Sequence, residues 1–242
     1  MKGSREKVAV VGAGLVGSLW AIYLARRGYR VEVFERRPDL RRETISAGRS
    51  INLAISLRGL HALSKLGLEE EALRAAIPMY GRMVHVPGAE PALQPYGKDR
   101  SEHINSISRG WLNGFLMDRA EKEGVRIRFE NRCDDAGQLD AKWVFGADGA
   151  HSSIRSTLEK QGEIRTEESP LDYGYKELTL PDDGGKHRLY KNALHIWPRG
   201  AYMLIALPNP DGSFTCTLFL SFKGESSFER LSDEGAVTRF FR

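Results

Sequence analysis

The sequence has little of several features that would place it in a specialised class of protein. Its 242 residues contain two cysteines, Cys133 and Cys216, whose separation matches no metal-binding or redox spacing. We therefore expect two buried, reduced thiols and a cytoplasmic protein. No apolar run reaches about 18 residues, which predicts no transmembrane helix. The first apolar run begins within a few residues of Met1, so no signal peptide is expected.

The charge of the chain is nearly balanced. Lys and Arg number 36 and Asp and Glu number 32, a formal net charge of +4. The basic residues are scattered and form no block, so the composition does not indicate nucleic-acid binding. A hydrophobic content of 41% and a charged content of 28% are typical of a globular protein. A chain of this length can form one large domain or two small ones.

The strongest pattern in the sequence lies within its first 35 residues. A short apolar run at residues 7–11 is followed at once by a Gly-x-Gly-x-x-Gly motif at residues 12–17. A helical pattern continues to Gly28, and a β-branched run at residues 30–35 ends in an acid, Glu35. This order of strand, glycine turn, helix, strand and acid predicts a βαβ unit that binds an adenine dinucleotide.

Each part of this fingerprint has a physical role. Gly12 permits the tight turn, and Gly14 lets the backbone approach a pyrophosphate because no Cβ stands in the way. Gly17 lets the helix pack close to the strand, and the helix N-terminus offers unpaired N–H groups to the phosphates. Glu35 can accept hydrogen bonds from both ribose hydroxyls, which disfavours NADP here. The fingerprint does not separate NAD from FAD.

The segment that follows is a charged loop over residues 36–49. We expect Arg36 near the ribose and Arg49 near a phosphate if the loop lies along the cofactor. The remaining arginines of this loop are expected to be solvated: Arg37, Arg41 and Arg42.

Beyond the loop, the first part of the chain alternates helical and strand patterns, and the part after Asp172 is mostly alternating strands joined by turns. The strand at residues 142–149 ends in Asp148 and Gly149, at the end of a strand where α/β proteins bind ligands. The pattern predicts helices at 56–66, 68–76, 110–124 and from 227, and strands at 79–86, 93–97, 125–129, 142–149, 173–180, 189–197, 201–207 and 214–222.

Two groups of strand residues could contact a ligand. Arg82 and Tyr96 are expected on neighbouring strands, where an arginine fork could bind a carboxylate and the tyrosine hydroxyl could add a hydrogen bond. Pattern alone favours the plainer alternative of a surface arginine and a packing tyrosine. An apolar face of the later strands is either a sheet packed on its own core or the wall of an aromatic-substrate pocket. It includes Met203, Ile205, Leu207 and Phe219.

Six blocks, in order and at family spacing, resemble those of the kynurenine 3-monooxygenase family. They are residues 12–17 (GAGLVG), 48–54 (GRSINLA), 81–85 (GRMVH), 94–97 (QPYG), 105–109 (NSISR) and 194–199 (LHIWPR). Residues 206–209 and 213–219 extend the resemblance over essentially the whole chain. The family belongs to the wider group of FAD-dependent aromatic hydroxylases, whose second signature resembles Asp148–Gly149.

The resemblance implies an α/β fold in which a Rossmann-like FAD-binding domain is interleaved with a mostly antiparallel substrate-binding β-sheet domain. The expected domains are residues 1–78 with 99–168, and residues 79–98 with 169–242. The implied reaction is hydroxylation of L-kynurenine to 3-hydroxykynurenine. NADPH reduces FAD, and the reduced flavin captures O₂ as a C4a-hydroperoxide. The flavin does this chemistry, so no catalytic side chain and no metal are expected.

The resemblance also assigns residues to the two ligands. Arg82 and Tyr96 match the family's ligands for the substrate carboxylate, which reverses the plainer alternative. The residues that match the apolar wall around the substrate ring are Leu194, Met203, Ile205, Leu207 and Phe219. With the fingerprint glycines and Arg36, the expected FAD-binding residues are Gly12, Gly14, Val16, Gly17, Glu35, Arg36, Ala54, Arg109, Asp148 and Gly149.

One departure from the family pattern stands out. The group's third FAD motif, a Gly-Asp pair that contacts the ribityl chain and pyrophosphate, has no counterpart in the sequence. The chain is therefore expected to be truncated at its C-terminus and to hold the adenine half of FAD better than the flavin half. Two alternatives are a non-catalytic nucleotide-binding fragment and a related hydroxylase with another substrate.

A third alternative is an NAD-dependent dehydrogenase, which would need a catalytic cluster after the βαβ unit. The histidines are scattered singly and are expected to be structural or on the surface. They are His61, His85, His103, His151, His187 and His195. The sequence predicts no oligomeric state.

Overall fold

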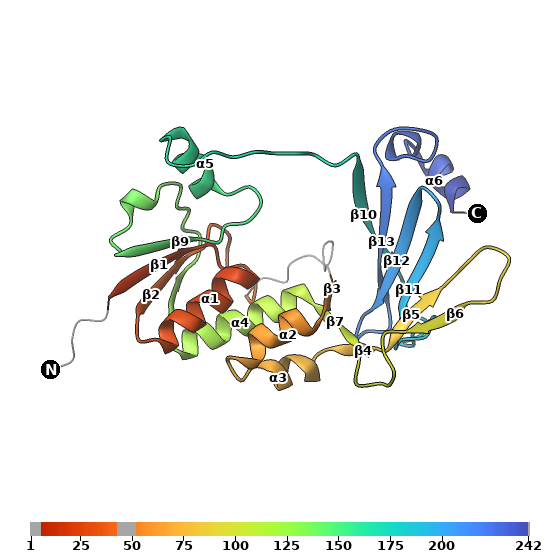
Figure 1. Ribbon diagram of the computed structural model, residues 1–242, viewed down its shortest axis with the longest axis horizontal. Coiled ribbons are helices and arrows are strands. Elements are labelled where there is room, and N and C mark those ends of the chain that lie inside the picture. Colours follow the sequence, from red (N-terminus) through yellow and green to blue (C-terminus); the bar gives the residue numbers. More distant parts are fainter. Residues whose placement is uncertain (1–5, 43–51, 242) are drawn as a thin grey trace. The chain divides into compact units, whose positions relative to one another are not determined.

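The computed structural model describes residues 6–42 and 52–241, which form two compact units (Figure 1). The first unit comprises residues 6–42 and 109–168, and the second comprises residues 52–108 and 169–241. The expected domains had placed residues 52–78 and 99–108 in the first part. They belong to the second unit because they pair with each other as strands and because Asn52 donates hydrogen bonds to the Pro208 carbonyl and to Asn209.

The first unit is built on a four-stranded parallel sheet. In spatial order its strands are β8 (Arg126–Arg128), β2 (Arg30–Phe34), β1 (Lys7–Val11) and β9 (Trp143–Gly146). The helices α1 (Leu15–Arg26) and α4 (Arg109–Lys122) lie side by side, as Figure 1 shows. The central strand β1 is buried along nearly its whole length, as expected for a strand covered on both faces. These elements confirm the predicted βαβ unit.

The second unit contains two sheets. The small sheet has the order β3–β7–β4, and the large one has the order β10–β13–β12–β11–β5–β6. The strands of the small sheet are β3 (Asn52–Ile55), β4 (Ile77–Met79) and β7 (Ile104–Ser108). Those of the large sheet are β5 (Gly81–Val84), β6 (Ala92–Pro95), β10 (Tyr173–Leu180), β11 (Leu194–Arg199), β12 (Tyr202–Pro208) and β13 (Phe214–Ser221). In the large sheet only β5 and β11 pair in parallel, so the antiparallel expectation is confirmed.

The two faces of the large sheet carry different side chains, because successive residues of a strand point to opposite sides. We call one the Arg82 face, which carries Arg82, Leu194, Ile196, Met203, Ile205, Leu207, Thr217 and Phe219 by register. We call the other the His195 face, which carries His195 and the core residues Ala206, Phe214 and Cys216. Leu178, Leu189 and Trp197 pack against that core.

Three predicted elements differ from the structure. The strand expected at 79–86 is divided at Tyr80 between β4 and β5, which belong to different sheets. The strand expected from Leu189 begins only at Leu194. The helix expected from Ser227 is a short 3₁₀ turn, Phe228–Arg230, and a separate helix α6 (Glu234–Phe240) begins after Asp233. Asp233 caps α6 by accepting a hydrogen bond from the Ala236 N–H, a signal that the sequence reading missed.

The other helices are short. They are α2 (Leu57–Ser64), α3 (Glu69–Arg74) and α5 (Ser153–Lys160). Ser56 stands at the predicted N-cap position of α2, although its side chain makes no capping hydrogen bond. In the part of the chain that the structure describes, every helix falls short of the length and apolarity needed to cross a bilayer.

Candidate functional site

The turn between β1 and α1 is held in a conformation that only glycine permits. Gly12 has φ +101°, and its N–H donates to the Phe34 carbonyl at 2.8 Å. A Cβ on Gly12 would lie 2.5 Å from the Ala147 carbonyl oxygen, and one on Gly17 would lie 1.9 Å from the Gly12 carbonyl oxygen. Both glycines are therefore required by close packing, which confirms the roles inferred for them as turn and packing residues.

Neither the backbone conformation nor the packing of the described residues requires a glycine at position 14. Gly14 occupies the N-cap of α1 at φ −71°, which any residue can adopt, and a Cβ there would meet nothing within 4 Å. The first backbone N–H groups of a helix lack intrahelical acceptors and carry the positive end of its dipole. Val16, in the first turn, is 71% exposed. This end of α1 can accommodate a phosphate at the backbone.

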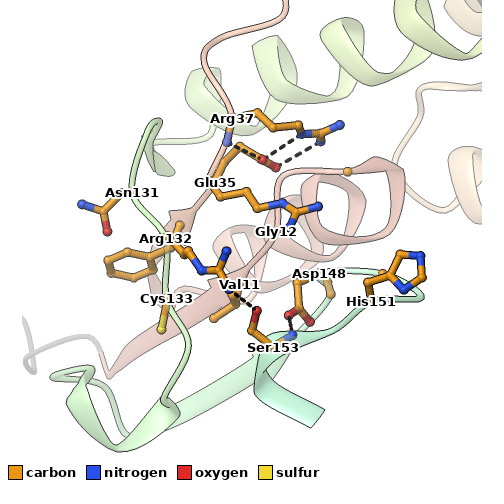
Figure 2. Close-up of a pocket in the computed structure, with 15 residues that line it drawn as sticks. Val11, Gly12, Glu35, Arg37, Asn131, Arg132, Cys133, Asp148, His151 and Ser153 are labelled. Atoms are coloured by element: carbon orange, nitrogen blue, oxygen red, sulfur yellow. Dashed lines mark hydrogen bonds and ion pairs between the residues drawn. The ribbon is translucent and has the colours of Figure 1, made fainter. Parts of the chain in front are cut away.

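Glu35 lies at the end of β2, only 4% exposed, and its carboxylate is surrounded by donors. Oε2 accepts a hydrogen bond from the Ala13 N–H at 2.9 Å, and Oε1 accepts from the backbone N–H of Arg37 at 2.9 Å. The Arg37 guanidinium donates to both oxygens, at 2.9 and 3.2 Å (Figure 2). Burial alone would raise the pKa of Glu35, but the hydrogen bonds from Arg37 and Ala13 lower it. The carboxylate is therefore ionised.

Arg37 is therefore not the solvated loop residue that the sequence suggested. Its side chain is 59% exposed, and the hydrogen bond to Glu35 raises the pKa of its guanidinium. Ribose hydroxyls that donated to Glu35 would take acceptor positions now used by this guanidinium. Because Arg37 is largely exposed, it can move away at small cost.

Arg41 is a second arginine that the structure corrects. Its side chain is 18% exposed and donates to Asp39, Asp118 and Glu121 at distances of 2.6–2.8 Å. This network attaches the loop after β2 to α4. The expected position of Arg49, near a phosphate, lies outside the described residues.

A pocket of about 230 Å³ lies at the carboxyl edge of the four-stranded sheet (Figure 2). Six of the predicted cofactor residues line it: Gly12, Gly14, Glu35, Arg36, Asp148 and Gly149. The other nine lining residues were not predicted: Val11, Phe34, Arg37, Asn131, Arg132, Cys133, Ala147, His151 and Ser153. The residues that follow the parallel strands β8 and β9 could have been predicted to line the pocket, because they must lie at the same sheet edge as the end of β2.

Cys133 also differs from its expected role as a buried thiol. It is half-buried and lines the pocket, whereas Cys216 is buried as expected. Burial raises the pKa of the Cys133 thiol, and the nearby Asp134 carboxylate adds to this rise. The thiol is therefore protonated at neutral pH and serves as a small lining group.

Asp148 shapes the pocket by accepting hydrogen bonds from the start of α5, whose N-cap residue is Ser152. Its Oδ1 accepts from the Ser152 hydroxyl at 2.6 Å, and its Oδ2 accepts from the backbone N–H groups of Ser153 and Ile154 at 2.7 and 3.3 Å. These bonds hold the start of α5 beside the pocket, and Gly149 follows at φ +89°. A direct contact from Asp148 to a cofactor remains a prediction.

The residues of this pocket fit the adenosine diphosphate part of a dinucleotide. The space in front of Gly14 and the free N–H groups of α1 suit a pyrophosphate, and the buried carboxylate of Glu35 suits a ribose. Arg36 and Arg132 also line the pocket, and the Arg132 guanidinium is paired with the exposed Asp134 carboxylate. Within residues 6–42 and 52–241, no group of three or more His, Cys, Asp and Glu side chains is arranged to hold a metal ion.

Four of the predicted cofactor residues do not line the pocket, and one of them, Gly17, is instead required for the close packing of the turn. Val16 lies in the first turn of α1, and Arg109 is the exposed first residue of α4. Ala54 is exposed in β3, in the second unit. Their contacts with FAD remain predictions.

The second candidate site is the Arg82 face of the large sheet. Arg82 in β5 is directly opposite Gln94 in β6, and Tyr96 follows just after β6, with its N–H donating to the Tyr80 carbonyl. The two residues therefore lie on neighbouring segments, although only Arg82 is within a strand. The Arg82 guanidinium carbon lies 5.3 Å from the centroid of the Tyr96 ring. The buried Tyr96 hydroxyl has no hydrogen-bond partner among the described residues, and burial raises its pKa although Arg82 opposes this. A polar ligand would satisfy it.

The strand register brings the predicted apolar wall beside Arg82. Leu194 in β11 is aligned with Arg82 in the parallel pair, and Ile196 is opposite Ile205 in β12. Met203 is opposite Phe219 in β13. All the residues predicted for the wall therefore share one face with Arg82: Leu194, Met203, Ile205, Leu207 and Phe219.

Comparison with known sequences supports the resemblance found in the sequence blocks. The family described as "FAD binding domain" matches residues 5–180. The chain is 56% identical to the kynurenine 3-monooxygenase of Myxococcus xanthus, over 98% of this chain and 55% of that protein. It is 48% identical to the one from Cytophaga hutchinsonii, over 98% of this chain and 57% of that protein. The chain spans about half the length of the curated relatives it matches.

Comparison with solved structures supports the fold. A tetrameric form of 2-methyl-3-hydroxypyridine-5-carboxylic acid oxygenase is similar with a TM-score of 0.70 at 19% identity, over 90% of this chain and 60% of that one. CtdE, solved with FAD and a substrate, is similar with a TM-score of 0.70 at 16% identity, over 91% of this chain and 58% of that one. At these identities the likeness shows the fold alone.

Proposed function

Because the chain belongs to the FAD binding domain family and is similar to kynurenine 3-monooxygenases over nearly its whole length, we propose that it contributes FAD and substrate contacts to an NADPH-dependent hydroxylase of L-kynurenine. The observation that carries the proposal is the open space at Gly14, in front of the α1 N-terminus. A glycine that neither the backbone conformation nor the packing requires is expected where a phosphate approaches the backbone.

The first unit binds the adenosine diphosphate half of FAD in this proposal. The N–H groups of α1 receive the pyrophosphate, and Glu35 accepts hydrogen bonds from the ribose after Arg37 moves aside. Asn131, Arg132 and Cys133 form the wall at the side of β8. When bound, FAD supplies the redox chemistry that uses NADPH and O₂ to hydroxylate an aromatic ring.

The second unit binds the substrate. The Arg82 guanidinium forms two charge-assisted hydrogen bonds to the amino-acid carboxylate, and the unpaired Tyr96 hydroxyl adds a third. The apolar wall packs against the aromatic ring, fixes its orientation and excludes water. No side chain is required to act as a nucleophile or base, because the protein's part is to bind and orient.

Titration of the protein with FAD and with ADP, followed calorimetrically, tests the cofactor site. Gly14→Ala should weaken binding of both ligands by about tenfold or more, because the methyl group occupies the phosphate position. The matched control is Gly114→Ala, in α4 of the same unit, where a Cβ makes only ordinary contacts with the Arg41 and Leu40 side chains at 3.4 Å or more and no residue of the helix lines the pocket. Equal affinities for Gly14→Ala and the control would overturn the assignment.

The same titrations test whether the chain holds one half of FAD better than the other. Because the sequence supplies no Gly-Asp motif for the ribityl chain, ADP and FAD should bind with similar affinity. Turnover, measured as kynurenine-stimulated oxidation of NADPH, should be low or absent. FAD binding at least a hundredfold tighter than ADP binding, with brisk turnover, would contradict this expectation.

A further inference from the structure

Two histidines that the sequence reading treated as structural or surface residues meet on the His195 face. His85 follows β5 and His195 lies in β11, 110 residues apart in the chain. Their ring planes are inclined by only 29°, and His85 Nε2 lies 2.8 Å from His195 Nδ1, so the rings meet edge to edge through their nitrogens. His195 is only 2% exposed. The proposed function gives this pair no direct contact with cofactor or substrate.

The hydrogen-bond partners of the two histidines determine which of their ring nitrogens carry a proton. His195 Nε2 lies 2.9 Å from the Tyr190 carbonyl oxygen, which can only accept, so Nε2 carries the proton and donates. Nδ1 of the neutral His195 ring is then an acceptor, and His85 Nε2–H donates to it. The result is a directed chain of hydrogen bonds from His85 through His195 to the Tyr190 carbonyl.

The surroundings keep both rings neutral. His85 stacks on Trp197 at 4.3 Å between ring centroids, and His195 contacts Phe214 edge-on at 5.6 Å. Burial lowers the pKa of both histidines, and the positive charge of Arg199 lowers the pKa of His85 further. Arg199 also donates to the His85 carbonyl oxygen at 2.9 Å.

The backbone link between β5 and β11 is short, which gives the side-chain link its importance. The parallel register covers three residue pairs, including Leu194 with Arg82. It is extended at one end by the His85 N–H donating to the Ile196 carbonyl and at the other by the Tyr80 N–H donating to the Asn192 carbonyl. This pairing joins the β5–β6 hairpin, which carries Arg82 and Tyr96, to the rest of the large sheet. A slip of one residue would turn Arg82 to the opposite face.

We propose that His85 and His195 are positioning residues that fix β5 against β11 and thereby hold Arg82 beside Leu194 to receive the carboxylate of the substrate. This inference rests on the proposed function, because it takes Arg82 to be the carboxylate ligand. The pair acts from the opposite face of the sheet and contacts neither the substrate nor the cofactor.

Nitrogen NMR of the wild-type protein labelled with ¹⁵N-histidine tests the pair directly. A scalar coupling between His85 Nε2 and His195 Nδ1, with proton-bearing Nε2 atoms on both rings, is the expected signature. If the coupling is absent, or if either ring carries its proton on the other nitrogen at neutral pH, the inference is wrong regardless of how the variants behave.

Binding of two ligands separates positioning from general damage to the fold. L-Kynurenine has the carboxylate that Arg82 would bind, and kynuramine, its decarboxylated analogue, lacks it. His195→Phe keeps the ring volume and removes both hydrogen bonds, so it should weaken L-kynurenine binding by about tenfold, the scale of disturbing one charge-assisted contact. Binding of kynuramine should change little. Equal weakening for both ligands would show a merely structural role and overturn the proposal.

Two further variants complete the test. His85→Gln retains an N–H donor and should preserve most of the affinity for L-kynurenine. His187→Phe is the matched control, because it removes another histidine–carbonyl hydrogen bond, to Asn209, in the same unit. If this control matched His195→Phe, the pair would have no special role. Wild-type protein that bound neither ligand would instead overturn the proposed function, and the inference with it.

Discussion

The candidate site of the first unit is formed mainly by backbone groups, whereas that of the second unit is formed by side chains. In the first unit, the pocket depends on backbone geometry: two glycines that allow close packing, one glycine that leaves space, and the end of a helix. In the second unit, the candidate site consists of side chains that the sheet brings into register from β5, β11, β12 and β13. The first site is local in sequence at its centre, whereas the second joins segments more than 100 residues apart.

This difference determines how each site should respond to mutation. A site made of backbone is sensitive to added atoms, because a single methyl group collides with the main chain or fills the ligand space. A site made of side chains in register is sensitive to removed atoms and to anything that shifts one strand against its neighbour. Variants that add atoms to the first unit and remove atoms from the second should therefore differ in kind.

Removal of the carboxylate ligand should have the largest effect. Arg82→Ala should weaken L-kynurenine binding by about 2–4 kcal/mol, the scale of losing one partner of a desolvated charge pair. The measurement is calorimetric or flavin-fluorescence titration of the protein with L-kynurenine. Arg74→Ala is the control, because that arginine is largely exposed on α3 in the same unit. If Arg82→Ala bound L-kynurenine with unchanged affinity, Arg82 would not be the ligand of the substrate carboxylate.

Addition of one methyl group should damage the first unit. In Gly17→Ala the new Cβ would lie 1.9 Å from the Gly12 carbonyl oxygen, so the free energy of unfolding should fall by about 1–3 kcal/mol or more. Gly14→Ala, three residues earlier, should leave stability unchanged or slightly higher. Urea denaturation of both variants measures the difference. If the two variants were equally stable, the close packing of this turn would be disproved.

Loss of the Asp148 hydrogen bonds to the start of α5 should lower stability by less. Asp148→Ala removes three hydrogen bonds to the start of the helix and should lower the free energy of unfolding by about 0.5–2 kcal/mol. Because the same segment lines the pocket, ADP binding should weaken as well. Asp140→Ala, an exposed acid in the same unit that pairs with Lys7 and does not line the pocket, is the control. A variant with normal stability and reduced binding would instead indicate direct contact with the ligand.

Mild acid should distinguish the two units by a small effect. The pKa of His85 and of His195 lies below its ordinary value of 6.5, so the unfolded chain gains protons first and stability falls as the pH drops below 6.5. The pKa of Glu35 lies below its ordinary value of 4.5, so its contribution is kept until the pH falls below 4.5. Peptide-resolved hydrogen exchange, corrected for intrinsic rates, should therefore show β5 and β11 loosening before β1 and β2. Simultaneous loosening would contradict the contrast.

The sequence predicted much of the first unit and less of the second. The βαβ unit, with Gly12, Gly17 and Glu35 in their expected places, could be read directly because a glycine turn between two β-branched runs has few other solutions. The division of residues 79–86 into two sheets could not be read, since each strand's partner is set by distant residues. Asn131 and Cys133 were missed because their contribution depends on which strands become neighbours.

By itself, the sequence determined the local conformations: where the chain must turn, which helix presents free N–H groups, and which strand residues share a face. These follow from backbone sterics and from the two-residue period of a strand. Tertiary packing alone sets three contacts: Arg37 pairs with Glu35, Asp148 accepts hydrogen bonds from the start of α5, and His85 meets His195 on the face opposite Arg82. Such contacts depend on strand order and register, which arise from the packing of the whole unit and leave no pattern within any one segment.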